Sequence, residues 1–358
     1  MIEQKAIDDA CTLFNCHFAN VQPHCGSSAN QAVFRAFCKN GDTVLGMDLG
    51  AGGHLTHGHK LSFSGQDYDI KSYGVDENGI LDYKELEELL WKYHATMIIV
   101  GASSYSQIID YERISKIIEN YVNSTGAPKP IYMVDMAHVA GLVAAGVHPS
   151  PFPWADVVTS TTHKTLRGPR GGLILWDNEE YTNKINRAVF PGVQGGPLEH
   201  IIAAKGICFE EALQPEFKEY GKQIIKNAKV FADEFKNHFW KIVSNGTENH
   251  MFVLDVYNSI GMTGKEAEVA LDKVNITVNK NQIPNDTLSP LVSSGIRIGV
   301  PAMTTKGWKE DDFKLLAIMI DRYLKNYEKD KDNSELESDM SEAVNRLINK
   351  VKDRENGN

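Results

Sequence analysis

The chain has 358 residues, of which 42% are hydrophobic and 23% are charged, and its formal net charge is −10. This composition supports one large core or two cores in sequence, and the acidic balance argues against nucleic-acid binding. We find no apolar run long enough for a membrane span, no secretory signal, and five cysteines without a CxxC pair, so we expect a cytoplasmic protein without membrane attachment, a disulfide scaffold or a metal site. Organellar targeting is the alternative, because a targeting peptide would precede the present Met1.

The first half of the chain alternates short apolar runs with helical patterns. The apolar runs predict buried strands at 43–48, 97–101, 130–135, 156–160 and 172–176. Helical spacing of apolar residues predicts helices at 27–37, 83–93 and 111–121. This alternation is typical of an α/β fold with a mainly parallel sheet covered by helices.

The pattern changes after about residue 212. We predict a long helix at 217–240, a strand at 251–256, a helix at 264–274 and a further helix through Phe313 and Leu324. The chain thus divides into a large domain at 1–212, a smaller C-terminal α/β domain at 213–328 and a charged tail at 329–358. Apolar residues at helical spacing within that tail predict a surface helix, to which we assign no chemistry; a partner-binding helix is the alternative.

Segment 22–30 places small polar residues directly before a predicted helix. Free backbone N–H groups and the helix dipole there form a cup for an anion such as a phosphate. An ordinary helix N-cap by Ser27 or Ser28 is the simpler interpretation of this segment taken alone. No nucleotide-binding glycine motif is present in the chain.

Segment 50–59 combines glycines with His54, His57 and His59. Three histidines suggest a metal site, but we see no carboxylate or cysteine nearby that completes a ligand set. The glycines instead favour close approach of the backbone to a flat ligand, on which a histidine ring can stack.

Two charged residues at the ends of predicted strands are further candidates for a binding site. Asp135 ends an apolar strand, where a structural salt bridge is the alternative to ligand binding, and Lys164 follows the next strand. A desolvated lysine is a good nucleophile, although a lysine at a strand end is usually a solvated surface residue. Together, a lysine amine, an acid and an anion cup match the requirements of pyridoxal phosphate: an aldehyde partner, a partner for the ring nitrogen and a phosphate site.

Six segments closely resemble the serine hydroxymethyltransferase family of fold-type-I pyridoxal-phosphate enzymes. They are GGHLTHG (52–58), VDMAHVAGLVAAG (134–146), TTHKTLRGPR (161–170), FPGVQGGP (190–197), NITVNKN (275–281) and SGIRIG (294–299). The resemblance runs from about residue 6 to about residue 324. It implies a PLP-dependent transferase that interconverts serine and tetrahydrofolate with glycine and 5,10-methylenetetrahydrofolate through a PLP aldimine.

The resemblance also implies roles for the matching positions. Lys164 would bond to the cofactor, Asp135 would pair with the ring nitrogen, His54 would stack on the ring, and His163 and Thr161 would tune the chemistry. His138 and Ser103 would lie near the ring oxygen. The phosphate would bind at Gly26 and Ser27, beside Cys25 where the family often has serine, helped by Gly195 and Gly196 of a neighbouring subunit. Arg297 would bind the amino acid carboxylate as a bidentate fork. The implied folate-lining residues are Leu49, Gly53, His54, Leu55, Asn281, Ser289, Pro290 and Leu291.

The family also carries an N-terminal segment, with a glutamate general acid/base, that residues 1–20 do not resemble. We therefore expect the cofactor scaffold to be retained and folate-dependent turnover to be weak unless that segment is supplied. The alternatives are a catalytically deficient paralogue or fragment that binds partners, and a folate-independent amino-acid aldolase. The expected partners are serine, glycine and tetrahydrofolate, in a homo-oligomer with shared active sites.

Overall fold

The computed structural model describes residues 1–327 and 332–355, which form two compact units. Unit 1 comprises Met1–Asp76, Leu81–Ser103 and Ile108–Gly221; unit 2 comprises Glu77–Ile80, Ser104–Gln107 and the chain from Lys222 onward. The predicted domain limit at residue 212 coincides with the end of helix α8 (Glu199–Ala212), whereas the contacts divide the chain at Gly221, inside helix α9 (Pro215–Asn237). The other predicted limit, at 328/329, lies outside the described residues.

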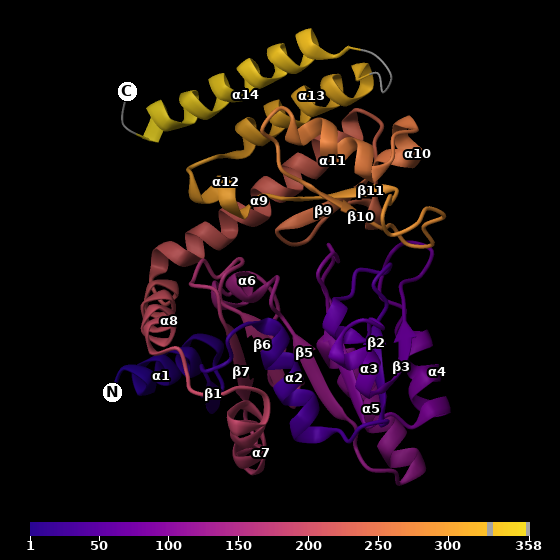
Figure 1. Ribbon diagram of the computed structural model, residues 1–358, viewed down its shortest axis with the longest axis vertical. Coiled ribbons are helices and arrows are strands. Elements are labelled where there is room, and N and C mark those ends of the chain that lie inside the picture. Colours follow the sequence, from indigo (N-terminus) through magenta and orange to yellow (C-terminus); the bar gives the residue numbers. More distant parts are fainter. Residues whose placement is uncertain (328–331, 356–358) are drawn as a thin grey trace. The chain divides into compact units, whose positions relative to one another are not determined.

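Unit 1 is built on a seven-stranded sheet with the order β1-β7-β6-β5-β4-β2-β3 (Figure 1). Strands β3, β2, β4, β5 and β6 run parallel, while β7 and β1 pair antiparallel at one side, so the predicted mainly parallel sheet is confirmed. The strands are β1 (Phe18–Asn20), β2 (Thr43–Met47), β3 (Asp69–Tyr73), β4 (Met97–Gly101), β5 (Ile131–Asp135), β6 (Val157–Thr161) and β7 (Gly172–Trp176).

The five predicted strands correspond to β2, β4, β5, β6 and β7, in which every residue except Thr43 and Asp135 is apolar or buried. The burial pattern of β4, β6 and β7 is continuous, which is typical of strands covered on both faces. Strands β1 and β3 were missed, since β1 has only three residues and β3 carries polar residues at most positions.

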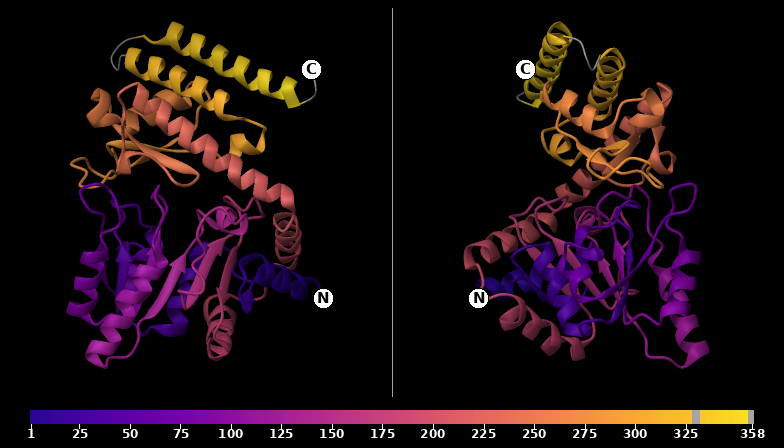
Figure 2. Two further views of the ribbon diagram at one scale, coloured as in Figure 1. Left: turned by 180° about the vertical axis from the view of Figure 1, so that it is seen from behind. Right: turned by 45° about the vertical axis from the view of Figure 1, so that its right-hand side comes forward.

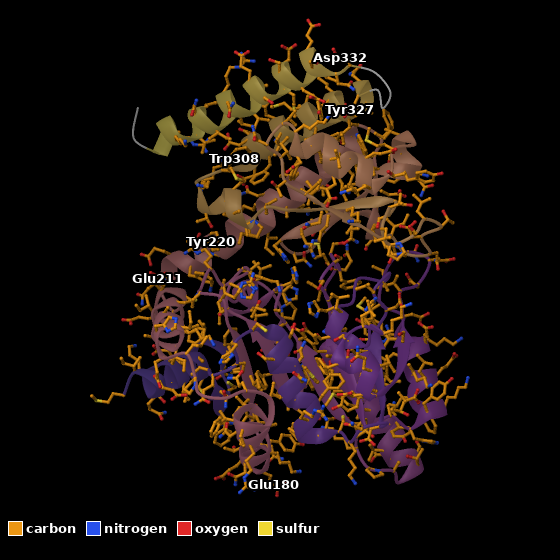
Figure 3. All side chains as sticks on the ribbon, in the orientation of Figure 1. Glu180, Glu211, Tyr220, Trp308, Tyr327 and Asp332 are labelled. Carbon is orange, nitrogen blue, oxygen red and sulfur yellow. The ribbon has the colours of Figure 1, made fainter. Side chains whose placement is uncertain are left out.

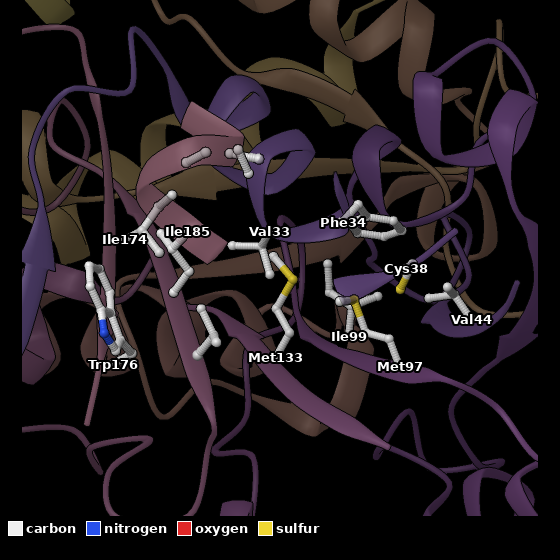
Figure 4. Close-up of a cluster of buried hydrophobic side chains, with 14 of the residues drawn as sticks. Val33, Phe34, Cys38, Val44, Met97, Ile99, Met133, Ile174, Trp176 and Ile185 are labelled. Carbon is white, nitrogen blue, oxygen red and sulfur yellow. The ribbon is translucent and has the colours of Figure 1, made fainter. Parts of the chain in front are cut away.

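Helices of unit 1 follow the strands in the expected alternation. They are α1 (Ile2–Phe14), α2 (Gly26–Phe37), α3 (Phe63–Asp67), α4 (Tyr83–Tyr93), α5 (Tyr111–Thr125), α6 (Ala140–Ala144), α7 (Thr182–Arg187), α8 and the first turns of α9. One core cluster joins Val33 and Phe34 of α2 to Met133 of β5 and to Ile174 and Trp176 of β7 (Figure 4). This packing fixes α2 against the sheet, and therefore fixes the position of its N-terminus.

Unit 2 is built on a four-stranded antiparallel sheet with the order β10-β11-β9-β8. Its strands are β8 (Lys241–Ile242), β9 (Met251–Asp255), β10 (Asn279–Asn281) and β11 (Gly295–Gly299). Its helices are the rest of α9, α10 (Val256–Ile260), α11 (Gly264–Asp272), α12 (Pro301–Thr305), α13 (Glu310–Asn326) and α14 (Ser334–Glu355). Phe231, Phe235, Phe252 and Phe313 form its aromatic core, with neighbouring ring centroids 5.3 to 5.9 Å apart.

The charged tail forms a helix, as its spacing predicted. Helix α14 runs alongside α13 in both views of unit 2 (Figures 1 and 2). It buries Met340, Val344, Leu347 and Val351, and Arg354 Nη2 contacts Asp312 Oδ2 at 2.7 Å. The apolar stripe therefore packs within its own unit, which favours the surface-helix interpretation over partner binding. Among the described residues, no helix is both long and apolar enough to cross a membrane.

Candidate active site

A cavity of about 170 Å³ lies in unit 1 where the parallel strands β4, β5 and β6 end. Because carboxyl ends of parallel strands meet at one edge of the sheet, residues distant in sequence converge there. The N-terminus of α2 and the loop after β2 complete the walls. The lining residues are Cys25, Gly26, Ser27, His54, Ala102, Ser103, Asp135, Ala137, His138, Thr161, His163, Lys164 and Arg170.

Asp135, the last residue of β5, accepts hydrogen bonds on both carboxylate oxygens. Its Oδ1 accepts from the backbone N–H of Ala137 at 3.1 Å. Its Oδ2 accepts from Nδ2 of Asn30 at 2.9 Å and lies 3.1 Å from Nε2 of His57, which is itself only 2% exposed. This carboxylate is therefore held in one orientation by groups from three different elements.

The surroundings of Asp135 favour its charged form. Burial alone would raise the pKa of this carboxyl, but the hydrogen bond from His57, the nearby charges of His57 and His54, and the hydrogen bond from Asn30 outweigh burial. The pKa of Asp135 therefore lies well below its ordinary value, and the group is ionised at neutral pH. A permanent carboxylate at this place is suited to hold a protonated ring nitrogen.

His54 lies beside this network, with its ring centroid 5.6 Å from that of His57. Its Nδ1 lies 2.7 Å from Oγ1 of Thr56, and burial lowers the pKa of the imidazole, with Asp135 partly opposing that shift. The ligand atoms of His54, His57 and Asp135 lie within 4.8 Å of one another. The histidine segment itself contains no carboxylate, but the fold brings Asp135 beside His57 from 78 residues away.

The start of α2 forms the predicted cup. The backbone N–H of Cys25 donates to Oγ of Ser28 at 3.0 Å, and this hydroxyl donates back to the carbonyl of Cys25. A Cβ on Gly26 would lie only 2.7 Å from Cγ2 of Thr161, so glycine is required there for the loop to approach β6. Burial would raise the pKa of the Cys25 thiol, but hydrogen bonds from Ser28 and Ser27 and the charge of Arg170 lower it. The same groups would favour a bound anion.

Lys164 lies in the loop between β6 and β7. Two threonines of this loop, Thr162 and Thr165, hold it in place by hydrogen bonds to backbone carbonyls. Oγ1 of Thr162 donates to the carbonyl of Pro169 at 2.6 Å, and Oγ1 of Thr165 donates to the carbonyl of His138 at 2.9 Å. Nδ1 of His163 accepts from the backbone N–H of Gly171 at 3.4 Å. Burial lowers the pKa of His163, followed by the charges of Lys164 and Arg170, so its ring is neutral near pH 7.

The side chain of Thr161 gives the clearest sign of a ligand. Its Oγ1 is buried and has no hydrogen-bond partner among the residues that the structure describes. Buried hydroxyls without partners are rare in proteins, and this one faces a cavity that also contains an amine, a carboxylate and a helix N-terminus. The donor set and the glycine-lined cup fit pyridoxal phosphate, which needs all three groups.

Other predicted residues lie outside this cavity. Leu49 and Leu55 are exposed at the loop after β2, and Gly53 packs with its Cα against the carbonyl of Met47. Gly195 and Gly196 do not line this cavity, and among the described residues no heavy atom beyond their chain neighbours would lie within 4 Å of a Cβ at either position.

The remaining predicted residues belong to unit 2. Arg297, on β11, donates from Nη2 to Oδ1 of Asn279 at 3.1 Å and lies 3.5 Å from Oγ of Ser104. That hydroxyl donates to Oδ1 of Asn281 at 2.6 Å. The stretch 289–291 lies in the loop between β10 and β11, where the Asp286 carboxylate accepts from Ile283 N, Leu288 N, Ser294 N and Ser294 Oγ.

Sequence reasoning missed five residues at the cavity or directly behind it. Asn30 and His57 hold Asp135, and Ala102, Ala137 and Arg170 line the walls. His57 belongs to the histidine segment and Asn30 is the last residue of the predicted cup segment, so both residues lie in segments that the sequence had singled out. The sequence does not show that these two segments lie next to the end of β5.

The fold and the cavity together define an enzyme of the fold-type-I pyridoxal-phosphate class. The family model described as serine hydroxymethyltransferase matches residues 1–320. The chain is 56% identical over 318 residues to serine hydroxymethyltransferase 1 of Pseudomonas savastanoi, covering 88% of this chain and 74% of the relative. It is 54% identical to the serine hydroxymethyltransferases of Francisella tularensis subsp. novicida (89% and 75% covered) and Mycoplasma mobile (91% and 76% covered).

The chain therefore belongs to the serine hydroxymethyltransferase family. Its reaction transfers the hydroxymethyl carbon of serine to tetrahydrofolate, and pyridoxal phosphate is the cofactor. The predicted fold, enzyme class, cofactor and co-substrate are thereby confirmed.

Proposed function

We propose that the cavity of unit 1 is where this reaction takes place. The observation that carries the proposal is that Lys164, Asp135 and the start of α2 line one cavity. When bound, pyridoxal phosphate supplies an electron-accepting ring that stabilises the charge left on Cα as the Cα–Cβ bond of serine breaks. The residues around it bind, orient and exchange protons.

Asp135 holds the proton on the ring nitrogen. Because Asn30 and His57 keep the carboxylate ionised and oriented, it favours the protonated, electron-poor form of the ring. His54 would stack on the cofactor ring, and the N–H groups of Gly26 and Ser27 would bind the phosphate at the dipole of α2. His138 and Ser103, which line the same cavity, would hydrogen-bond to the ring oxygen.

Lys164, which lines the cavity, would supply the amine that holds the cofactor by its aldehyde. His163, neutral near pH 7, can accept a proton within the same cavity, and the free Oγ1 of Thr161 can hydrogen-bond to the bound group. The hydrogen bonds of Thr162 and Thr165 hold the loop that carries Lys164 and His163 in place. These residues therefore handle protons around the reacting carbon.

We assign substrate recognition beyond the cavity from the family resemblance. Arg297 binds the carboxylate of serine or glycine, since Asn279 and Ser104 hold its guanidinium as a fixed fork. Leu49, Gly53, Leu55, Asn281 and the stretch 289–291 contact tetrahydrofolate. We further propose a cytoplasmic homo-oligomer in which Gly195 and Gly196 reach the phosphate in a neighbouring copy.

The test is replacement of Lys164 by alanine in the full chain. We expect Lys164→Ala to lose the yellow absorbance that bound cofactor gives and at least about 10³-fold of hydroxymethyl transfer from serine to tetrahydrofolate. Lys116→Ala is the matched control, because Lys116 is an exposed lysine paired with Glu112 on α5. Absorbance and transfer that survive in Lys164→Ala would show that the chemistry lies elsewhere.

A further inference from the structure

Lys205 of α8 is a buried lysine that the reaction described above does not use. Its side chain is among the largest fully buried ones, with 1% of its surface exposed. Its Nζ donates to the carbonyl oxygens of Val21 at 2.6 Å, Gly172 at 2.8 Å and Pro23 at 3.0 Å. Among the residues that the structure describes, no carboxylate forms an ion pair with this amine.

The geometry requires the charged form of Lys205. An ammonium has three N–H donors and each finds a carbonyl, whereas a neutral amine has only two. Burial lowers the pKa of Lys205 to about 8, and the nearby Cys25 opposes that shift, so the ammonium prevails at neutral pH. Among the described residues, three backbone carbonyls thus accept every hydrogen bond of this buried positive charge, and its burial without a carboxylate partner costs free energy.

The three carbonyls belong to the chain that leads into the phosphate cup. Val21 and Pro23 connect β1 to the cup, and Pro23 precedes the N-cap residue Cys25 by two positions. Gly172 N donates to the carbonyl of Pro23 at 2.9 Å, and a Cβ on Gly172 would lie 2.3 Å from the carbonyl oxygen of Cys25. Lys205 therefore connects residues 21–23, which lead into the cup, with Gly172 at the start of β7.

The backbone around Lys205 is shaped to admit its side chain. A Cβ on Gly171 would lie 2.2 Å from Cε of Lys205, so the glycine leaves the passage through which the lysine reaches the carbonyls. Gly171 also donates its N–H to Nδ1 of His163 at 3.4 Å. A single buried cation thus lies between the cup at the start of α2 and the loop that carries Lys164.

We propose that Lys205 is a positioning residue for the cofactor phosphate: it fixes the path of residues 21–23 into the cup and places a buried positive charge behind it. The inference rests on the proposed binding of phosphate at Cys25–Ser28. A dianionic phosphate gains from a cation held in a low-dielectric interior, and the carbonyl contacts leave Lys205 unable to move away. Lys205 itself does not touch the reacting atoms.

The experiment compares binding of pyridoxal phosphate with binding of pyridoxal, which has the same aldehyde and ring but no phosphate. Dissociation constants are measured by absorbance titration of the cofactor-free full chain. In Lys205→Met we expect the affinity for pyridoxal phosphate to fall by about tenfold or more while that for pyridoxal changes less than about threefold. A purely structural role would weaken both ligands equally, so their ratio isolates the phosphate.

Two further substitutions of Lys205 keep the test decisive if Lys205→Met does not fold. Lys205→Gln can donate two hydrogen bonds to the carbonyls without a charge, and we expect it to lose selectivity for the phosphorylated ligand. Lys205→Arg retains the charge and is expected to keep more of that selectivity. Lys5→Met is the matched control, because Lys5 is an exposed lysine that pairs with Glu210 of α8.

A variant of the cup separates failure of this inference from failure of the proposed phosphate site. Ser27→Asp places a negative charge in the cup at an exposed position and should selectively weaken pyridoxal phosphate. If Ser27→Asp is selective but the Lys205 variants weaken both ligands equally, or neither, Lys205 only supports the fold. If Ser27→Asp is not selective either, the phosphate binds elsewhere.

Discussion

Replacing Asn30 with alanine tests the network that orients Asp135. Asn30 is 1% exposed and makes three hydrogen bonds: to Oδ2 of Asp135 at 2.9 Å, to Oγ1 of Thr56 at 2.8 Å, and from Oγ1 of Thr159 at 2.7 Å. A hydrogen bond to a charged group contributes about 2 kcal/mol and one between neutral groups about 1 kcal/mol. Asn30→Ala should therefore lower the free energy of unfolding by about 4 kcal/mol.

A loss of that size is a large part of the 5–15 kcal/mol that typically stabilises a protein. It is measured by urea denaturation of the cofactor-free chain, with Asn237→Ala as control, because Asn237 is exposed and makes a single long hydrogen bond to Glu234. The control should change stability by less than about 0.5 kcal/mol. A loss below about 1 kcal/mol in Asn30→Ala would refute the reasoning, since it would mean that water replaces the amide at no cost.

The substitution Asn30→Asp changes the charge of the side chain at this position but keeps its size. It keeps the size of the side chain but puts a second carboxylate where Nδ2 now lies 2.9 Å from Asp135. Two carboxylates that close cannot both be ionised, so the pair must share a proton. We expect Asn30→Asp to bind pyridoxal phosphate at least about tenfold more weakly. Unchanged affinity would show that the charge of Asp135 does not hold the ring nitrogen.

Three further predictions concern backbone packing, pH and the loop after β10. Gly46→Ala should lower the free energy of unfolding by about 3 kcal/mol, because its Cβ would lie 2.0 Å from the carbonyl oxygen of His57. The control Gly206→Ala should lower it by less than about 1 kcal/mol, because the nearest atom to its Cβ would be 3.5 Å away. Thermal unfolding measures both changes. Since burial lowers the pKa of His54 in the folded chain, the unfolded chain binds the proton first, and stability that is complete above about pH 6.5 should fall as the pH drops below that value. Urea denaturation at pH values from about 8 to about 5.5, which span the ordinary histidine pKa, measures this loss of stability, and the loss should be smaller in His54→Phe than in the unchanged chain. Asp286→Ala, which removes four hydrogen bonds within its loop, should raise the KM for tetrahydrofolate about tenfold and leave the affinity for pyridoxal phosphate unchanged; loss of both would contradict the folate assignment.

Local patterns predicted individual elements closely. Strands β4 and β7 and helix α4 have the predicted bounds, because a run of apolar residues or a 3.6-residue spacing depends only on neighbours along the chain. Strand β1 was not predictable in this way. Three residues, Phe18–Asn20, become a strand only because Trp176, Leu175 and Ile174 of β7 lie beside them.

The sequence by itself determined the chemical groups of the site. The amine, the acid and the small polar residues before a helix stood out because charged and polar residues at the ends of apolar segments are expensive unless they bind something. Motif order then identified the family. Together these gave Lys164, Asp135 and the start of α2, all of which line the cavity (Figure 3 draws the side chains of the described residues).

Only the tertiary structure decided which groups act on one another. The contacts of Asn30 and His57 with Asp135 bridge 105 and 78 residues, and those of Lys205 with Val21 and Gly172 bridge 184 and 33. An apolar pattern records that a face is buried but not what it is buried against, so the order of the strands, and with it every contact between segments, arises when the sheet assembles. The ionised state of Asp135 and the buried charge of Lys205 both follow from that assembly.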